Sequence, residues 1–475
     1  MGLASVAVFS ESDRAALHVR LADEAYPIGD DAASESYLNI DRLIDVARRS
    51  GATGVHPGYG FLAENPHFAE ACAGAGLTFI GPSPAAMRAM GSKTAARAIA
   101  AQAGVPVVPG GDSPGAAGYP LLVKAVAGGG GKGMRIVRNA DELASSVQMA
   151  RSEATSSFGD DRVYFERLLE STRHIEVQVL GDSHGTVVPF VERECSIQRR
   201  HQKLIEETPS PAVGPELRTR LMSAAVAIGR AAGYTNAGTV EFLVDQGGEF
   251  YFLEMNARLQ VEHPVTEATT GVDLVRAQIE IARGATIAGT GPSARGHAIE
   301  VRVYAENPDA GFLPSPGRIT HLRSPSGPGV REDSGAYEGW VVPTAYDPLV
   351  SKVIVWAEDR PRAIARMVRA LSEYDIRGIG TTVGFCRQLI GSPAFAAAEF
   401  DTSYVDRWLT GTPRHSASND CEEAAAVAAA MWMARLKSSP TIVRSSHTDV
   451  GRDVSRAADR PRSPWARQAR LDSLR

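Results

Sequence analysis

The sequence is short of cysteine, of long apolar runs and of any excess of one charge, and each shortage excludes a class of protein. The few cysteines have no paired spacing, which argues against a disulfide framework or a zinc site and fits a reducing compartment; they are Cys72, Cys195, Cys386 and Cys421. No apolar run approaches the roughly 18 residues of a membrane-spanning helix, and the first residues lack the basic-then-apolar order of a signal peptide. We therefore expect a soluble, cytoplasmic protein.

The charges are nearly balanced. Lys and Arg number 50 and Asp and Glu number 55, which gives a formal net charge of -5. Nothing in this overall charge favours nucleic acid or an anionic membrane as a partner. A chain of 475 residues also exceeds what one hydrophobic core organises, so we expect two to four domains.

The first part of the chain alternates strand-like and helix-like segments. Residues 3–9 and 77–80 have the apolar composition of strands, and residues 39–50 have the period of an amphipathic helix. This alternation predicts a parallel α/β layer. A Gly- and Pro-rich stretch at 105–120 then indicates a domain junction.

The middle of the chain mixes strands with helices up to about residue 400, a pattern typical of α+β structure. Its clearest strand patterns lie at 121–126, 174–180, 239–244 and 249–255. Residues 438–475 are rich in Ser, Arg, Asp and Pro and lack periodicity. This composition predicts a disordered tail, with a short docking segment as the alternative.

A glycine run, Gly128 to Gly131, follows the strand expected at 121–126. Glycines let backbone N–H groups approach an anion closely, but the spacing fits neither a P-loop nor a dinucleotide-binding motif. A flexible turn is the alternative. Lys124 strengthens the interpretation as a phosphate site, because a lysine in an apolar strand needs a partner and a phosphate is one.

Two carboxylates lie inside apolar, strand-like segments about a hairpin apart. They are Glu241 and Glu254, and Asn256 follows two residues later. Oxygen ligands of this kind suit Mg²⁺, which in a nucleotide site bridges phosphate oxygens. Buried salt bridges to nearby arginines are the alternative, and spacing alone does not choose between the two.

Arg258, Gln260 and Glu262 alternate just after this segment. If the chain stays extended there, the three side chains point to one side. A cation, an amide and a carboxylate on one face could bind a small oxyanion and supply a base. A solvated strand face is the alternative.

Several segments together resemble the biotin carboxylase family. They are HPGYGFLAEN (56–65), GPSPAAMRAMGSK (81–93), KAVAGGGGKGM (124–134), RRHQKLIEETPSP (199–211) and EMNARLQVEHPVTE (254–267). The last two are long and specific, and the resemblance runs from about residue 3 to about 410. A further segment at 302–319 is similar to the forms in acyl-CoA carboxylase α-subunits.

The resemblance implies an ATP-grasp fold, in which two α+β parts clamp ATP and the glycine-rich part acts as a lid. The implied domains are an N-terminal α/β domain (1–82), an ATP-grasp domain (83–298, lid about 107–168), a C-terminal biotin carboxylase domain (299–409) and the tail (410–475).

The resemblance also implies the site residues. For ATP they are Lys93, Lys124, Gly129, Gly130, Gly131, the hinge from Glu166 to Leu169, His174, Gln198, His201 and Ile379. The implied metal ligands are Glu241, Glu254 and Asn256, and the implied bicarbonate pocket is Lys203, Arg258, Gln260 and Val261. Glu262 matches the general base that deprotonates bicarbonate, and Arg331 matches the arginine that stabilises the biotin enolate.

The activity implied is carboxylation of biotin by ATP and bicarbonate with Mg²⁺ or Mn²⁺, within an acetyl-, propionyl- or other acyl-CoA carboxylase. Residues 410–475 contain no AMKM-like motif for biotin attachment. We therefore expect the biotin carboxyl carrier protein and the carboxyltransferase to be separate partner chains, and we expect a homo-oligomer.

Two departures from the family pattern favour a different interpretation. Relatives begin with a strand, a glycine-bearing loop and a helix ahead of the position where Met1 falls, and they carry a helix where residues 111–118 form a short stretch. The alternative is a truncated, non-catalytic ATP-grasp paralogue with a binding or scaffold role.

Overall fold

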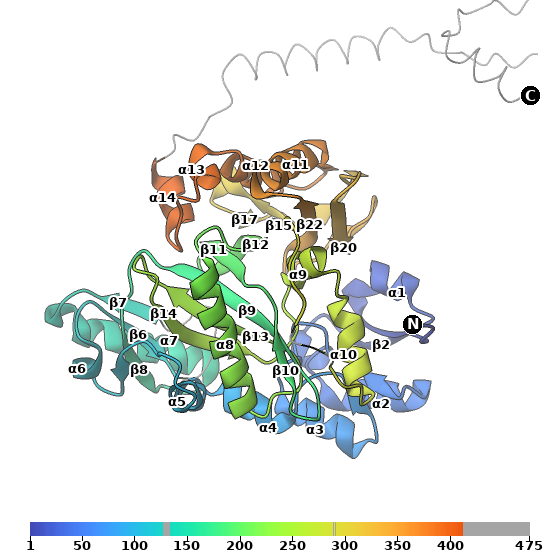
Figure 1. The fold of residues 1–475 in the computed structure, drawn as a ribbon. Coiled ribbons are helices and arrows are strands. Elements are labelled where there is room, and N and C mark those ends of the chain that lie inside the picture. The colour runs from blue at the N-terminus through green and yellow to red at the C-terminus, as the bar shows by residue number, and fades with distance from the viewer. Residues whose placement is uncertain (127–133, 288, 290, 412–475) are drawn as a thin grey trace, which may run out of the picture. The chain divides into compact units, whose positions relative to one another are not determined.

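A computed structural model of the chain describes residues 1–126, 134–287, 289 and 291–411 (Figure 1). Gly129, Gly130 and Gly131, and all of the predicted tail beyond residue 411, lie outside these ranges. Within them, no helix is long and apolar enough to cross a membrane.

The N-terminal part alternates strands and helices, as the sequence predicts. Its elements are β1 (Val6–Ser10), α1 (Leu17–Leu21), β2 (Glu24–Gly29), α2 (Ile40–Ser50), β3 (Gly54–Val55), α3 (Pro66–Gly74), β4 (Thr78–Phe79) and α4 (Pro84–Gly91). Strands β1 and β2 pair in parallel, as do β3 and β4. Helix α2 begins where the Asn39 side chain accepts from the Arg42 N–H at 3.1 Å, and it ends at Gly51 in the left-handed conformation. The helix predicted at 39–50 is confirmed.

A four-stranded antiparallel sheet follows the Gly- and Pro-rich stretch. Its order is β5-β8-β6-β7, and the elements around it are α5 (Lys93–Gln102), β5 (Gly110–Gly111), α6 (Pro114–Ala117), β6 (Leu121–Ala125), β7 (Met134–Val137), α7 (Leu143–Phe158) and β8 (Val163–Arg167). Helix α7 covers the sheet, with Ala150 packed among Leu121, Val123 and Val137. The short stretch at 111–118 does contain a helix, the four-residue α6.

A nine-stranded sheet forms the centre, in the order β14-β13-β9-β11-β12-β15-β22-β20 with β10 paired to β9. Its strands are β9 (Arg173–Gly181), β10 (Val187–Pro189), β11 (Arg193–Arg199), β12 (Gln202–Thr208), β13 (Asn236–Val244), β14 (Phe250–Asn256), β15 (His297–Tyr304), β20 (Val330–Ser334) and β22 (Leu349–Ala357). The strands predicted at 174–180, 239–244 and 249–255 are β9, β13 and β14.

Helices cover this sheet on both faces. Figure 1 shows α8 (Pro215–Ala231) lying across β9 and β13, and its Leu221 and Ile228 pack with Ile175 and Val177 of β9. Because strand side chains alternate, the remaining residues of β9 face the other way, and they include His174 and Glu176. Helix α9 (His263–Thr270) packs near β15 and β22 and is followed by α10 (Leu274–Ala282).

The C-terminal part packs against β15 and β22. Its helices are α11 (Arg360–Glu373), α12 (Val383–Ile390), α13 (Pro393–Ala396) and α14 (Tyr404–Gly411). Short strands complete it: β16 (Glu306–Asn307), β17 (Leu313–Pro314), β18 (Gly317–Arg318), β19 (His321–Arg323), β21 (Val341–Val342) and β23 (Asp375–Arg377). Ile299 and Val301 of β15 join Met367 and Leu371 of α11 in one core. The predicted fold class, α/β followed by α+β, is confirmed.

Candidate active site

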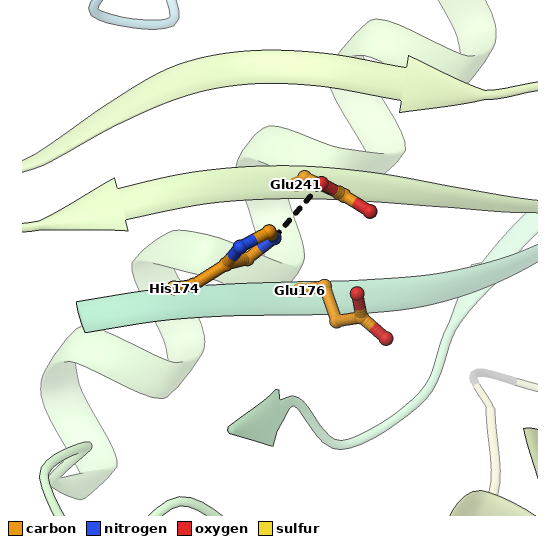
Figure 2. Close-up of side chains that lie close together, drawn as sticks. All are labelled: His174, Glu176 and Glu241. Carbon is orange, nitrogen blue, oxygen red and sulfur yellow. Dashed lines mark ion pairs between the residues drawn. The ribbon is translucent and has the colours of Figure 1, made fainter. Parts of the chain in front are cut away.

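Three glutamates lie side by side across three neighbouring strands. Glu241 of β13 is in register with Glu176 of β9 on one side and with Glu254 of β14 on the other. Figure 2 shows Glu176 and Glu241 on adjacent strands with His174 beside them. Like charges directly opposite one another destabilise a sheet, so this row requires cations.

Lys203 of β12 supplies the main cation. Its ammonium donates to Oε2 of Glu176 at 2.5 Å, to Oε1 of Glu241 at 2.9 Å and to Oε1 of Glu262 at 2.6 Å. An ammonium has three protons, so Lys203 uses its full donor capacity on three carboxylates. The side chain is only 12% exposed, and water therefore screens these ion pairs weakly.

The ion pairs shift the pKa values of their members in opposite directions. Burial lowers the pKa of Lys203, but the three carboxylates outweigh burial and hold it well above its usual value. Burial raises the pKa of Glu241, which Lys203 and His174 nevertheless hold well below its usual value. For Glu262, Lys203 and Arg302 likewise outweigh burial and hold the pKa well below its usual value. Both carboxyls are therefore ionised at neutral pH.

His174 and Glu254 flank Glu241. Nε2 of His174 lies 2.8 Å from Oε2 of Glu241, the pair drawn in Figure 2. Burial lowers the pKa of His174, but Glu241 reverses this and raises it. Burial and the nearby Glu241 raise the pKa of Glu254, whereas Lys93 and Lys124 lower it. Glu254 is thus the member of the carboxylate row that feels the two lysines expected at the phosphates.

The predicted metal ligands are brought together in part. Asn256 donates its amide to Oε1 of Glu241 at 2.9 Å, and Glu254 is the cross-strand partner of Glu241. In the described part of the chain, the tight clusters that could hold an ion are His174 with Glu176 and Glu241, and Glu176 with Cys195 and Glu262. A carboxylate pair whose mutual repulsion raises one pKa is chemically suited to a divalent cation. The alternative of salt bridges to arginines is wrong for Glu241, whose cationic neighbours are Lys203 and His174.

The segment after β14 does not stay extended, so the condition on which the alternation of Arg258, Gln260 and Glu262 depended is not met. The strand ends at Asn256, and the chain turns before α9 begins at His263. Gln260 and Glu262 nevertheless converge on the carboxylate row. Gln260 donates to Oε1 of Glu241 at 2.7 Å, and Glu262 contacts Lys203. The turn therefore brings the side chains of Gln260 and Glu262 to the same place, as an extended strand with alternating side chains would have done.

Neighbouring residues fix this turn. Nε of Arg258 donates to Glu64 at 3.0 Å, and Nη2 donates to Asn256 at 3.1 Å. The carbonyl of Val261 accepts from Lys352 at 2.8 Å.

Two buried arginines donate to side-chain oxygens of Gln260 and Glu262. Nη2 of Arg193 donates to Oε1 of Gln260 at 3.0 Å, which leaves the Gln260 NH₂ group to face Glu241. Nη2 of Arg302 donates to Oε2 of Glu262 at 2.8 Å.

Two residues predicted to bind the nucleotide contact each other. Lys124, predicted to pair with a phosphate, contacts Glu166, which the sequence placed at the adenine hinge. Arg97 also donates to Glu166, at 2.5 Å. Lys93 lies at the start of α5 and donates to the carbonyl of Ala125 at 3.3 Å. An internal carboxylate therefore pairs with the buried lysine.

The other predicted ATP residues come from several elements. Gln198 of β11 is in register with Lys203, His201 occupies the turn between β11 and β12, and Leu169 follows β8. Ile379 is partly buried and packs against Ile319 and Val342 in a small apolar cluster of the C-terminal part. Its contact with adenine stays a prediction.

Arg331 lies on β20 and is 43% exposed. Its Nη1 donates to Glu267 of α9 at 2.6 Å and its Nε to Asp333 at 2.7 Å. Burial lowers the pKa of Arg331, but these two carboxylates raise it. A cavity of about 420 Å³ adjoins this arginine, since Asp333 lines it together with Tyr59, His263 and Lys352.

Sequence reasoning missed four residues of the site. Glu176 and Arg302 are charged residues inside apolar strand patterns, the same signal that singled out Lys124 and Glu241, whereas Arg193 lies in a polar, charged segment that gave no such signal. Glu64, which accepts from the N–H of Ala257 at 2.8 Å, carried no signal of its own.

Comparisons with known proteins identify the family. Residues 1–87 match the family described as biotin carboxylase, N-terminal domain; residues 92–290 match the carbamoyl-phosphate synthase L chain, ATP binding domain; and residues 300–407 match the biotin carboxylase C-terminal domain. A pyruvate carboxylase component from Methanothermobacter thermautotrophicus is 53% identical over 424 residues, covering 86% of each chain. Biotin carboxylase of Nostoc sp. is 50% identical over 418 residues, covering 85% of this chain and 94% of its own.

A solved structure gives the same result. The biotin carboxylase domain dimer of Hydrogenobacter thermophilus 2-oxoglutarate carboxylase, in complex with MgADP, ADP and bicarbonate, has a TM-score of 0.83 at 43% identity. The match covers 86% of this chain and 92% of that one. The chain therefore belongs to the biotin carboxylase family of ATP-grasp ligases.

Proposed function

We propose that the protein carboxylates biotin on a separate carrier chain, with ATP and bicarbonate as co-substrates and Mg²⁺ or Mn²⁺ as the metal. The contact of Lys203 with Glu176, Glu241 and Glu262 carries the proposal. It places one cation between the proposed base and a proposed metal ligand. A small oxyanion bound to Lys203 would therefore lie beside the proposed base, Glu262, and the proposed metal ligand, Glu241.

Glu241, Glu254 and Asn256 would hold the divalent ion, which when bound neutralises charge on the phosphate oxygens. The charges of Lys93 and Lys124 lower the pKa of Glu254, which supports a phosphate site near this metal ligand. When ATP binds, Lys124 would exchange its contact with Glu166 for a contact with the phosphates.

Glu262 is the proposed base toward bicarbonate. Bicarbonate is a poor electrophile, and ATP activates it: a bicarbonate oxygen bonds to the γ-phosphorus, ADP leaves, and the bicarbonate proton passes to Glu262. Its low pKa keeps Glu262 ionised and able to accept this proton. An anion bound at Lys203 weakens the hold of Lys203 on Glu262 and makes Glu262 more basic.

Arg331 is the proposed residue for the second half-reaction. Carboxyphosphate breaks down to CO₂ and phosphate, and the phosphate takes the proton from N1 of biotin. The ureido enolate formed is an oxyanion, which Arg331 would stabilise by about 3–4 kcal/mol, the contribution of one preorganised donor. The biotin nitrogen then attacks CO₂.

The carboxyltransferase partner would choose the final acceptor. We favour an acyl-CoA carboxylase, because residues 302–319 have the form seen in acyl-CoA carboxylase α-subunits. Pyruvate is the second candidate, since the Methanothermobacter relative is named for pyruvate carboxylase. The proposed partners are the biotin carrier, the carboxyltransferase and a second copy of this chain, in the cytoplasm.

The test measures transfer of ¹⁴C from bicarbonate to biotin, free or on a carrier domain, with purified protein, ATP and Mg²⁺. Labelled, acid-labile carboxybiotin that requires ATP is the expected result. A protein that binds ADP but makes no carboxybiotin with either form would favour the alternative, a non-catalytic paralogue.

A further inference from the structure

Glu300 of β15 has an unusual environment. The residue is 0% exposed, and neither of its carboxyl oxygens has a hydrogen-bond partner among the residues that the structure describes. Its neighbours on the adjacent strands are Glu206 of β12 and Ile354 of β22. Oε2 of Glu206 also lacks a partner within the same ranges. A carboxylate that is buried without donors and opposite a second carboxyl is strongly disfavoured.

The nearest cations are engaged elsewhere. Arg302, two residues along β15 on the same face, donates to Glu206 at 2.6 Å and to Glu262 at 2.8 Å. Lys352, in register with Arg302 on β22, donates to the carbonyl of Val261 at 2.8 Å and lies 3.5 Å from Asp333. Both cations therefore hold residues of the proposed bicarbonate pocket and its surroundings.

The other side chains packed around Glu300 are mainly apolar. On its own face, Val265 of α9 packs with Ala298 and Ile354. The charged groups that act on it are Lys352, Arg302, Glu206 and Glu262, and the ring of His263 lies at the first turn of α9. Helices α11 and α12 pack on the opposite face, against Ile299 and Val301. Burial is the largest influence and, with the two glutamates, raises the pKa of Glu300 well above its usual value.

We propose that Glu300 is an uncharged positioning residue, whose neutral carboxyl group leaves Arg302 to Glu262 and Lys352 to Val261. This role rests on the proposed function of Glu262 as the base. An ionised Glu300 would attract both cations, because it lies on their face of the sheet between β12 and β22. Arg302 would then loosen from the base and Lys352 from the turn that carries it.

The first test is independent of activity. In the unfolded chain Glu300 ionises near pH 4.3, whereas the folded protein keeps the proton to higher pH. The folded state then binds the extra proton, so wild-type stability falls relative to Glu300→Gln as pH rises above that value. We expect the Tm of E300Q to exceed that of wild type by about 1 °C at pH 5 and about 4 °C at pH 8.

Glu207→Gln is the matched control. Glu207 lies on β12, is also buried, and accepts from His297 at 2.7 Å and from Arg360 at 2.7 Å. These donors outweigh burial and lower its pKa. E207Q should therefore lose Tm by about the same amount at pH 5 and at pH 8, because both values lie above the unfolded pKa of about 4.3, whereas the gap for E300Q should widen with pH. A pH-independent gap for E300Q, or a Tm below wild type at pH 8, would overturn the proposal.

The second test follows bicarbonate-dependent ATPase from pH 6.5 to 9.5. We expect the rate of wild type to decline at high pH and that of E300Q to remain on its plateau at least 0.5 pH unit further, roughly threefold in proton concentration. If the ATPase rates of wild type and E300Q decline over the same alkaline pH range, the positioning role is contradicted. If wild type has no such ATPase, the proposed function fails, while the Tm comparison still decides the charge of Glu300.

Discussion

Lys203 and Glu262 form a buried ion pair, with Nζ of the lysine 2.6 Å from Oε1 of the glutamate. The other oxygen of Glu262 accepts from Arg302 at 2.8 Å. The proposed base is thus held by one cation on each side, and the cation that it shares with Glu241 is the one expected to bind bicarbonate. If bicarbonate binds Lys203 as proposed, substrate binding and base strength are coupled through this lysine.

Lys203→Met should destabilise the protein strongly at neutral pH. It leaves Glu176, Glu241 and Glu262 without their common cation, and removal of one member of a buried pair costs about 3–5 kcal/mol of unfolding free energy. Lys203 holds the pKa values of Glu241 and Glu262 down, so this contribution is full above their unfolded pKa of about 4.3 and is lost as pH falls through the folded values. Urea denaturation at pH 7 and pH 4 measures both effects.

Arg220→Met is the control for this variant. Arg220 pairs with Glu249 at 3.1 Å, but its side chain is 42% exposed, and exposed pairs contribute about 0–1 kcal/mol. A loss from K203M no larger than that from R220M would show that the Lys203 cluster does not stabilise the fold.

Glu254→Gln tests the metal site. The change keeps the shape of the side chain and removes the charge opposed to Glu241, so we expect a folded protein whose bicarbonate-dependent ATPase falls by about 10²-fold or more. Glu249→Gln, on the same hairpin but exposed, should retain its activity. Near-normal ATPase in E254Q, with unchanged Mg²⁺ dependence, contradicts the assignment.

Arg193→Lys tests the orientation of Gln260. The change keeps the positive charge but removes the guanidinium group that donates to Gln260 and Thr239. One charged hydrogen bond is worth about 1.5–3 kcal/mol, so we expect the KM for bicarbonate to rise about 10-fold or more. The KM for ATP should change less than twofold in the same steady-state assays. Equal increases in both KM values would indicate general damage instead.

Local pattern predicted the scaffold of the site well. Period-2 alternation placed β9, β13 and β14, and an apolar strand interrupted by a charge revealed Lys124 and Glu241. The same signal was present for Glu176 and Arg302, but a single sequence does not say which strands become neighbours. The register that sets Glu176 against Glu241, across more than 60 residues, arises from sheet topology.

Other details depend on tertiary contacts that no local pattern encodes. Residues 258–262 form a turn rather than an extended strand because α9 begins at His263, and Glu64 and Lys352 fix this turn. Lys124 was expected to face a phosphate, yet Glu166, 42 residues away, is its partner. The packing of Ile379 against an apolar cluster of the C-terminal part likewise depends on contacts between segments that are distant in the sequence.

The central claim is that Glu262 serves the first half-reaction and Arg331 the second. The measurement compares ATP hydrolysis with bicarbonate alone against carboxylation of free biotin, for Glu262→Gln and Arg331→Ala, after circular dichroism confirms folding. Arg331 is partly exposed, so its removal should cost little stability. We expect R331A to lose biotin carboxylation by about 10²-fold while it keeps most of its slow ATPase, and E262Q to lose both activities. Parallel loss of both activities in R331A, or a full ATPase in E262Q, would contradict this division of roles.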